Sequence, residues 1–168
     1  MSQVAVSRPL YTPEQKQRRD ATAWTLVQGI LAPLQFLVFL ISLGLIGYAY
    51  VSGELWDLAL ASVVLKTLVL YLIMVTGAIW EKVVFGQYLF APAFFWEDVV
   101  SMGVIALHTA YLIAWLQADT VSLQTQIGIA LAAYASYVVN ATQFLYKLRM
   151  ARLQSPVLGA NVTGQVAA

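Results

Sequence analysis

The amino-acid sequence predicts an all-α polytopic membrane protein, a bundle of four transmembrane helices. Three observations indicate this fold class. Of the 168 residues, 61% are hydrophobic and only 10% are charged, whereas soluble domains carry about 25% charged residues. Four windows of the chain are apolar over the length of about 20 residues that a membrane-spanning helix needs. The basic residues outside these windows all fall on one side of the predicted bundle, as the positive-inside rule describes.

The first predicted element is a short interfacial helix in the segment YTPEQKQRRD. Thr12 is a suitable N-cap residue, and Pro13 fits the first helical position. Its basic residues would then lie beside anionic lipid head groups. The alternative is that this segment is only a solvated marker of the cytoplasmic side.

The four predicted spans follow in chain order. Because no water is available inside a bilayer, each span has to satisfy its backbone polar groups internally, which favours a helix. We expect residues 1–153 to form a single domain and the small, polar residues 154–168 to form a flexible tail. The predicted spans are Trp24–Tyr50, Trp56–Trp80, Glu97–Gln117 and Leu123–Tyr146.

Basic residues predict the orientation of the bundle. The first and third connections between spans contain acidic residues and no base. Both termini are therefore expected in the cytoplasm. The bases on the predicted cytoplasmic side are Arg8, Lys16, Arg18, Arg19, Lys82, Lys147, Arg149 and Arg152.

Three polar side chains fall near the middle of the predicted spans. Lys66 and the single histidine, His108, each lie about ten residues, or about 15 Å, from the outer ends of their spans. Gln35 lies at a similar depth. Ionisable groups are costly inside a membrane, so a polar pocket shared by these residues is a candidate ligand site. The alternative is a hydrogen-bonded cluster that fixes the register of the helices.

The stretch LFAPAFFWEDVVSM places two adjacent carboxylates at the start of the third span. Glu97 shares one helix face with Ser101 and His108, since successive residues turn by about 100°. Asp98 points in a different direction, so at least one of the two acids is expected to face protein. A helix-dipole role for carboxylates in a first turn is the alternative to a catalytic one.

Aromatic residues crowd the connection before these acids, ending in Phe94, Phe95 and Trp96. An aromatic belt at the membrane interface accounts for such rings. They would equally line a site for a flat, apolar ligand. Asn140 of the fourth span is another polar residue at this depth.

Long segments of the chain resemble the 2-vinyl bacteriochlorophyllide hydratases of photosynthetic bacteria. The resemblance is carried by TGAIWEKVVFGQYLFAPAFFWEDVVSM followed by ALHTAYL, and by DATAWTLVQGILAPLQFLVFL near the N-terminus. It extends over nearly the whole chain, to about Arg152. It implies a small hydro-lyase of the bacterial cytoplasmic or intracytoplasmic membrane, which adds water to the C3 vinyl group of a chlorophyllide on the route to bacteriochlorophyll a.

The resemblance also implies the expected ligands. The substrate would be a magnesium tetrapyrrole, and neither a cofactor nor a protein-bound metal is expected. Membrane lipid is an expected partner, nucleic acid is not, and contacts with a second copy or with other enzymes of the route stay open. From their positions and chemistry, rather than from the resemblance, the residues expected to bind substrate are His108, Lys66, Trp96, Phe94, Phe95, Ser101, Gln35 and Asn140, with His108 as a candidate axial ligand of the substrate's magnesium.

Glu97 and Asp98 are the expected catalytic residues. Hydration of a vinyl group needs a proton donor, a positioned water and stabilisation of a cation. One carboxyl group kept protonated by its apolar surroundings would supply the proton, and its ionised neighbour would stabilise the cation and orient the water. Two other functions are compatible with the residues alone: a non-catalytic pigment-binding or assembly protein, and a small transporter that uses Lys66 and His108.

Overall fold

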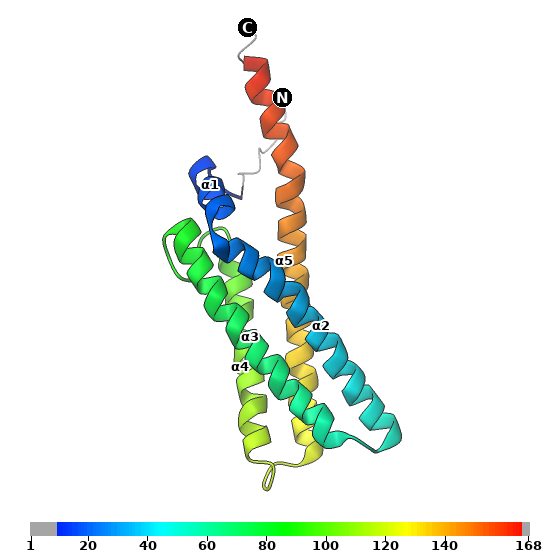
Figure 1. Cartoon of the computed structure of the whole chain (residues 1–168). Helices are drawn as coiled ribbons and strands as arrows, with labels where there is room; N and C mark the ends of the chain where they lie inside the picture. The colour runs from blue at the N-terminus through cyan, green and yellow to red at the C-terminus, as the bar shows by residue number, and fades with distance from the viewer. Residues whose placement is uncertain (1–9, 166–168) are drawn as a thin grey trace, which may run out of the picture.

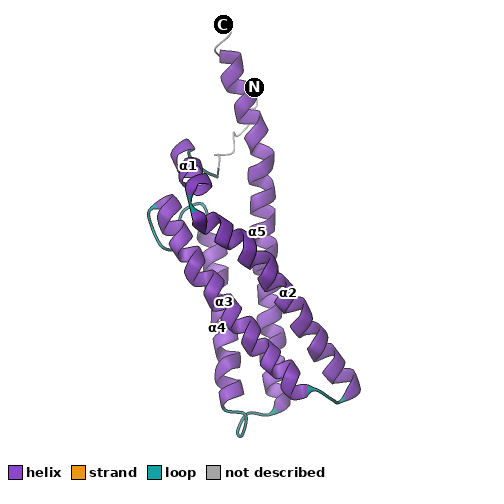
Figure 2. Cartoon of the chain, in the orientation of Figure 1, coloured by secondary structure: helices purple, strands orange, loops and turns teal. Residues whose placement is uncertain are grey.

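The computed structural model describes the backbone of residues 10–165 and the side chains of residues 10–150. Within this part the chain forms five helices and no strand (Figures 1 and 2). The all-α prediction is therefore confirmed, and the predicted spans correspond to the last four helices. The helices are α1 (Pro13–Ala21), α2 (Ala23–Ser52), α3 (Trp56–Phe85), α4 (Phe95–Leu116) and α5 (Leu123–Gln165).

Helix α1 begins where the sequence predicts. The Thr12 hydroxyl accepts a hydrogen bond from the Gln15 N–H at 3.2 Å, and the Gln15 side chain accepts one from the Thr12 N–H at 2.9 Å. This capping box satisfies two backbone donors, and Pro13 occupies the first turn. The ring of Tyr11, just before the helix, stacks on Phe85 with 5.8 Å between centroids. Helix α1 is thereby held against the end of α3.

Helices α2, α3 and α4 are long and apolar enough to cross a membrane. In the part of the chain with described side chains, α5 does not meet the same combination of length and hydropathy. Its inward-facing polar residues, including Asn140 and Gln143, lower its mean hydropathy. Helix α5 also extends to Gln165, so residues 154–165 are helical. The flexibility predicted for this tail stays a prediction, and residues 166–168 lie outside the described part.

The four long helices are arranged as two hairpins. Helix α2 packs along α3 and α4 packs along α5, whereas the main contact between the hairpins is made by α3 and α4. Figure 1 shows the α2–α3 hairpin in front of the α4–α5 hairpin. Small buried residues let the helices of each pair approach closely, namely Ala49 and Ala59 in the first hairpin and Ala130 in the second.

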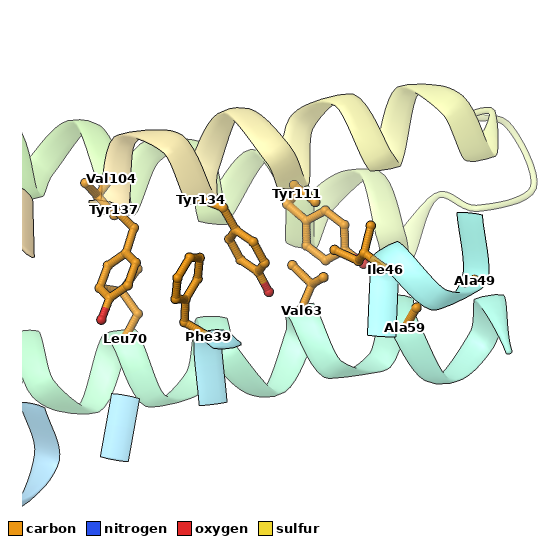
Figure 3. Packing of buried hydrophobic residues seen from close by; sticks show 11 residues of the cluster. Phe39, Ile46, Ala49, Ala59, Val63, Leu70, Val104, Tyr111, Tyr134 and Tyr137 are labelled. Atoms are coloured by element: carbon orange, nitrogen blue, oxygen red, sulfur yellow. The ribbon is translucent and has the colours of Figure 1, made fainter. Parts of the chain in front are cut away.

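Aromatic side chains fill the space between the hairpins (Figure 3). The ring of Phe39 on α2 lies 5.1 Å from each of the rings of Tyr134 and Tyr137 on α5, measured between centroids. Tyr111 on α4 reaches across to α3, where its hydroxyl donates to the Leu60 carbonyl at 2.8 Å. Large rings therefore separate the two hairpins, while small residues bring the helices within each hairpin together.

Candidate functional site

Two acidic residues from different hairpins meet at the end where α3 stops and α4 starts. Glu81 lies in the last turns of α3 and Asp98 in the first turn of α4. Both side chains are buried, and their carboxyl groups are near enough to interact electrostatically. We call Glu81 and Asp98 the carboxyl pair. Burial of two such groups side by side is unfavourable when both are ionised, so their proximity distinguishes them from ordinary surface acids.

The loop between α3 and α4 folds back over the carboxyl pair. It begins at Gly86, whose φ of 90° ends α3 in a conformation that glycine adopts without strain. Phe90 has a φ of 60°, and its N–H donates to Asp98 Oδ2 at 2.7 Å. The Ala91 N–H donates to Glu81 Oε2 at 3.3 Å. The loop thus supplies one backbone donor to each acid. Phe90, one of these donors, has a left-handed backbone that is uncommon for residues other than glycine and is often found at functional sites.

Glu97 is directed away from this pair. Its carboxylate forms an ion pair with Lys147 on α5, with 2.5 Å between Nζ and Oε2. The Lys147 ammonium also donates to the Ala93 carbonyl and lies 5.0 Å from the centroid of the Phe94 ring. The adjacent acids of the sequence therefore have different partners: Glu97 binds a base, whereas Asp98 lies against Glu81.

Ser101 and Asn140 tie α4 to α5 just below Glu97. Asn140 Nδ2 donates to the Glu97 carbonyl and to Ser101 Oγ, both at 3.0 Å. Ser101 Oγ also donates to the Glu97 carbonyl at 2.8 Å. Because these two side chains satisfy each other, they fix the position of the Glu97 backbone within the second hairpin.

The three predicted rings before the acids lie on different sides of the chain. Phe94 is buried, with 3% of its surface exposed, whereas Phe95 and Trp96 are 43% and 69% exposed. The Phe94 ring packs in a cluster with Trp80, Phe85 and Phe144, at centroid separations of 5.7, 5.8 and 5.9 Å. Of the predicted aromatic residues, Phe94 therefore belongs to the interior and the other two face outward.

Lys66 and His108 are completely buried between the hairpins. The Lys66 ammonium lies 3.8 Å from the centroid of the Tyr137 ring, and the His108 ring lies 6.0 Å from that of Tyr134. The two basic groups are near enough to interact electrostatically. We call the layer formed by Phe39, Lys66, His108, Tyr134 and Tyr137 the seam.

Two polar atoms of the seam have no hydrogen-bond partner among the described residues, namely Lys66 Nζ and His108 Nε2. His108 Nδ1 is engaged at 2.8 Å by the Val104 carbonyl. The predicted third member, Gln35, is buried on α2, but no hydrogen bond within the described residues joins it to either base. Of the three residues expected at mid-depth, Lys66 and His108 therefore interact with each other, and Gln35 is buried on α2.

The carboxyl pair and the seam lie at different depths. Asp98 and His108 are ten residues apart on α4, which corresponds to a rise of about 15 Å. Glu81, Lys147, Tyr134 and Tyr137 were not among the predicted site residues. The sequence signal available for Glu81 and Lys147 was that each is an ionisable residue at the end of an apolar window. The tyrosines carried no signal, because rings in an apolar helix are usually packing residues.

Together, the fold and these sites define a helical membrane protein with ionisable groups buried inside its bundle. The chain belongs to the 2-vinyl bacteriochlorophyllide hydratase family, whose model matches residues 11–150. This match confirms the resemblance and the predicted enzyme class, a hydro-lyase. It favours that class over the two alternatives, a pigment carrier and a transporter.

Two curated relatives carry the same family name. The protein from Cereibacter sphaeroides is 70% identical over 152 residues, covering 90% of this chain and 94% of the relative. The protein from Rhodobacter capsulatus is 65% identical over 148 residues, covering 88% and 85% of the two chains. No solved structure matches the chain.

Proposed function

We propose that this protein adds water to the C3 vinyl group of a chlorophyllide or bacteriochlorophyllide, giving the 3-(1-hydroxyethyl) group of the bacteriochlorophyll a route. Two relatives at 70% and 65% identity, each named a 2-vinyl bacteriochlorophyllide hydratase, support the reaction. The structural observation that carries the proposal is the carboxyl pair, two neighbouring buried acids that each accept one hydrogen bond from a loop N–H.

The reaction balances with the carboxyl pair as its only proton store. The protonated member of the pair gives its proton to the terminal CH2 carbon of the vinyl group. The positive charge that forms on the inner carbon is delocalised into the macrocycle. Water then adds to that carbon and returns a proton to the pair, so that one water is consumed and nothing is oxidised or reduced.

The roles within the site follow from the contacts. Because ionising two neighbouring buried carboxyl groups together is unfavourable, one keeps its proton and the pair presents one acid and one carboxylate. The carboxylate stabilises the developing cation, as preorganised charge does in other active sites. The loop N–H groups of Phe90 and Ala91 hold the two acids in position. Glu97, predicted as a catalytic residue, orients the start of α4 through Lys147.

The substrate's rings suit the surroundings of the pair. Phe94 forms the inner aromatic wall, and Phe95 and Trp96 supply exposed rings at the entry from the membrane interface. Ser101 and Asn140 complete the polar lining below Glu97. Lys66 and His108 bind the substrate deeper in the bundle. Gln35, a buried polar side chain of α2, is a further binding residue.

We also propose that α5 is the fourth span of a bacterial inner-membrane protein and that both termini are cytoplasmic. Helix α5 packs along α4, and the acid–base contact of Lys147 with Glu97 places bases of α5 at the same end as the start of α4. This end also holds Lys82 and α1, in agreement with the positive-inside rule.

The proposed reaction is tested with the purified full-length chain in lipid nanodiscs. The vinyl pigment is supplied in water enriched in oxygen-18, without reductant, nucleotide or added metal. We expect the product to gain one water and to contain the heavy oxygen. Pigment that binds stoichiometrically but keeps its mass would contradict the proposal and would indicate a pigment carrier.

A further inference from the structure

His108 offers a lone pair to the interior of the bundle. Its Nδ1 lies 2.8 Å from the Val104 carbonyl, and a carbonyl oxygen only accepts hydrogen bonds. In a neutral imidazole, Nδ1 must then carry the ring hydrogen, and Nε2 presents an unshared pair. That pair has no partner among the residues whose side chains are described, although the ring is completely buried.

Lys66 has the opposite character. Its ammonium only donates hydrogen bonds, it is completely buried, and the Tyr137 ring face at 3.8 Å is its neighbour. No carboxylate pairs with it in the described part of the chain. An ionisable group in this position inside a membrane protein is by default a candidate for a ligand site or a route for ions.

The two groups are complementary to a single ligand that carries a different polar group for each of them. It must present a Lewis acid or a hydrogen-bond donor to His108 Nε2 and an anionic or carbonyl oxygen to Lys66 Nζ. It must also have an aromatic face, since Phe39, Tyr134 and Tyr137 form the rest of the seam (Figure 3). A flat magnesium macrocycle with an ionised side chain has all three features.

The arrangement around His108 is the one that metal-binding histidines adopt. A ligating imidazole usually donates its second N–H to a carbonyl or carboxylate, which fixes the tautomer and the ring orientation. The Val104 carbonyl, one turn earlier on α4, takes this place. A magnesium ion already held by four ring nitrogens has room for an axial ligand of this kind.

The seam is also where the two hairpins meet. The hairpins are tightly packed internally, and they meet across side chains rather than across closely approaching backbones. Ligand sites in helical bundles are built between helices in this way. A planar ligand bound there would displace rings of the seam and leave the packing within each hairpin intact.

We propose that the macrocycle binds in the seam with His108 Nε2 as the axial ligand of its magnesium and Lys66 as the partner of an anionic oxygen on its edge. This rests on the proposed function for the identity of the ligand. It adds the orientation of that ligand, with the ring centre at His108 and its vinyl edge on the side of the carboxyl pair. Because about 15 Å of α4 separates His108 from Asp98, more than the radius of the macrocycle, the proton crosses the remaining gap through water.

The single histidine makes a direct test possible on the unaltered protein. The chain is labelled with nitrogen-15 histidine, and its two ring resonances are observed in nanodiscs. Before pigment is added, we expect the hydrogen on Nδ1. Saturation with magnesium chlorophyllide should shift the Nε2 resonance strongly, and the metal-free pigment should not. A hydrogen on Nε2, or a bound magnesium pigment that leaves Nε2 unshifted, overturns the proposal.

Variants test the same contacts through affinity. His108→Leu should lose the preference for magnesium pigment over metal-free pigment, while Thr109→Val, the neighbour bonded to Tyr71, should keep it. Lys66→Met should weaken binding of the pigment with a free carboxylate about tenfold or more and leave binding of its methyl ester unchanged. Lys82→Met, at an exposed site, is the control.

The outcomes separate this inference from the proposed function. Hydration that continues in His108→Leu with unchanged metal preference overturns the binding mode and leaves the reaction intact. Metal-specific binding through His108 without hydration supports the binding mode and contradicts the proposed reaction. If His108→Leu does not fold, the labelled wild-type protein still decides the question.

Discussion

Lys147 on α5 and Glu97 on α4 form an ion pair, with 2.5 Å between Nζ and Oε2. Because successive residues of a helix point about 100° apart, the adjacent Asp98 is directed elsewhere and lies against Glu81 of the opposite hairpin. Two adjacent acids in the sequence are in this way divided between a helix–helix contact and a buried carboxyl pair.

Replacing Glu97 by Gln should mainly affect stability. The change leaves the Lys147 ammonium without its anion in a partly buried position, at a cost of about 1–3 kcal/mol. Turnover per folded molecule should fall far less than it does in Asp98→Asn. A double-mutant cycle with Lys147→Met measures the coupling, and additive effects of the two changes would contradict a functional ion pair.

Asp98→Asn and Glu81→Gln should each cut turnover by about 10²–10⁴-fold, the usual contribution of a general acid or base. Both changes keep the shape of the side chain and remove the acid. Turnover is measured per folded enzyme, with pigment binding recorded separately. Asp57→Asn, at the far end of α3, is the matched control. Wild-type turnover in both variants would show that the pair is structural.

The backbone of Phe90 should matter more than its ring. Phe90→Gly keeps the N–H that donates to Asp98 and removes the penalty of about 1–2 kcal/mol for a left-handed residue with a side chain. It should retain activity and most of the stability. Phe90→Pro removes the N–H and cannot adopt a φ of 60°, so activity should be lost. Thermal unfolding and turnover of the two variants, measured together, check this.

Reporter fusions test the orientation of the bundle. A fusion after Arg152 should report the cytoplasm, and one in the connection at Gly53, between α2 and α3, should report the other side. A reporter that places the C-terminus outside the cytoplasm would show that α5 does not cross the membrane as proposed.

Much of the fold was predictable because each element has a local cause. The capping box at Thr12, the apolar windows and the short connections all depend on neighbouring residues, and the four long helices begin within two residues of the predicted starts. The tail of α5 was less predictable, since helix continuation past Arg152 has no hydrophobic signal.

The partners of the site residues could not be read from the sequence. Burial of Glu97, Asp98 and His108 follows from their positions on α4. The pairing of Asp98 with Glu81 depends on a loop that folds back through a left-handed Phe90, and the pairing of Glu97 with Lys147 depends on how α5 lies against α4. Both are long-range contacts without a periodic pattern.

The division into two hairpins has a consequence for the timing of the reaction. Glu81 belongs to the first hairpin and Asp98 to the second, so the carboxyl pair exists only while the hairpins are together. On the binding mode proposed above, a separation of the hairpins that admits pigment to the seam would also move Glu81 away from Asp98. Proton donation would then be confined to the closed protein, and a pigment still entering or already leaving would meet no assembled acid.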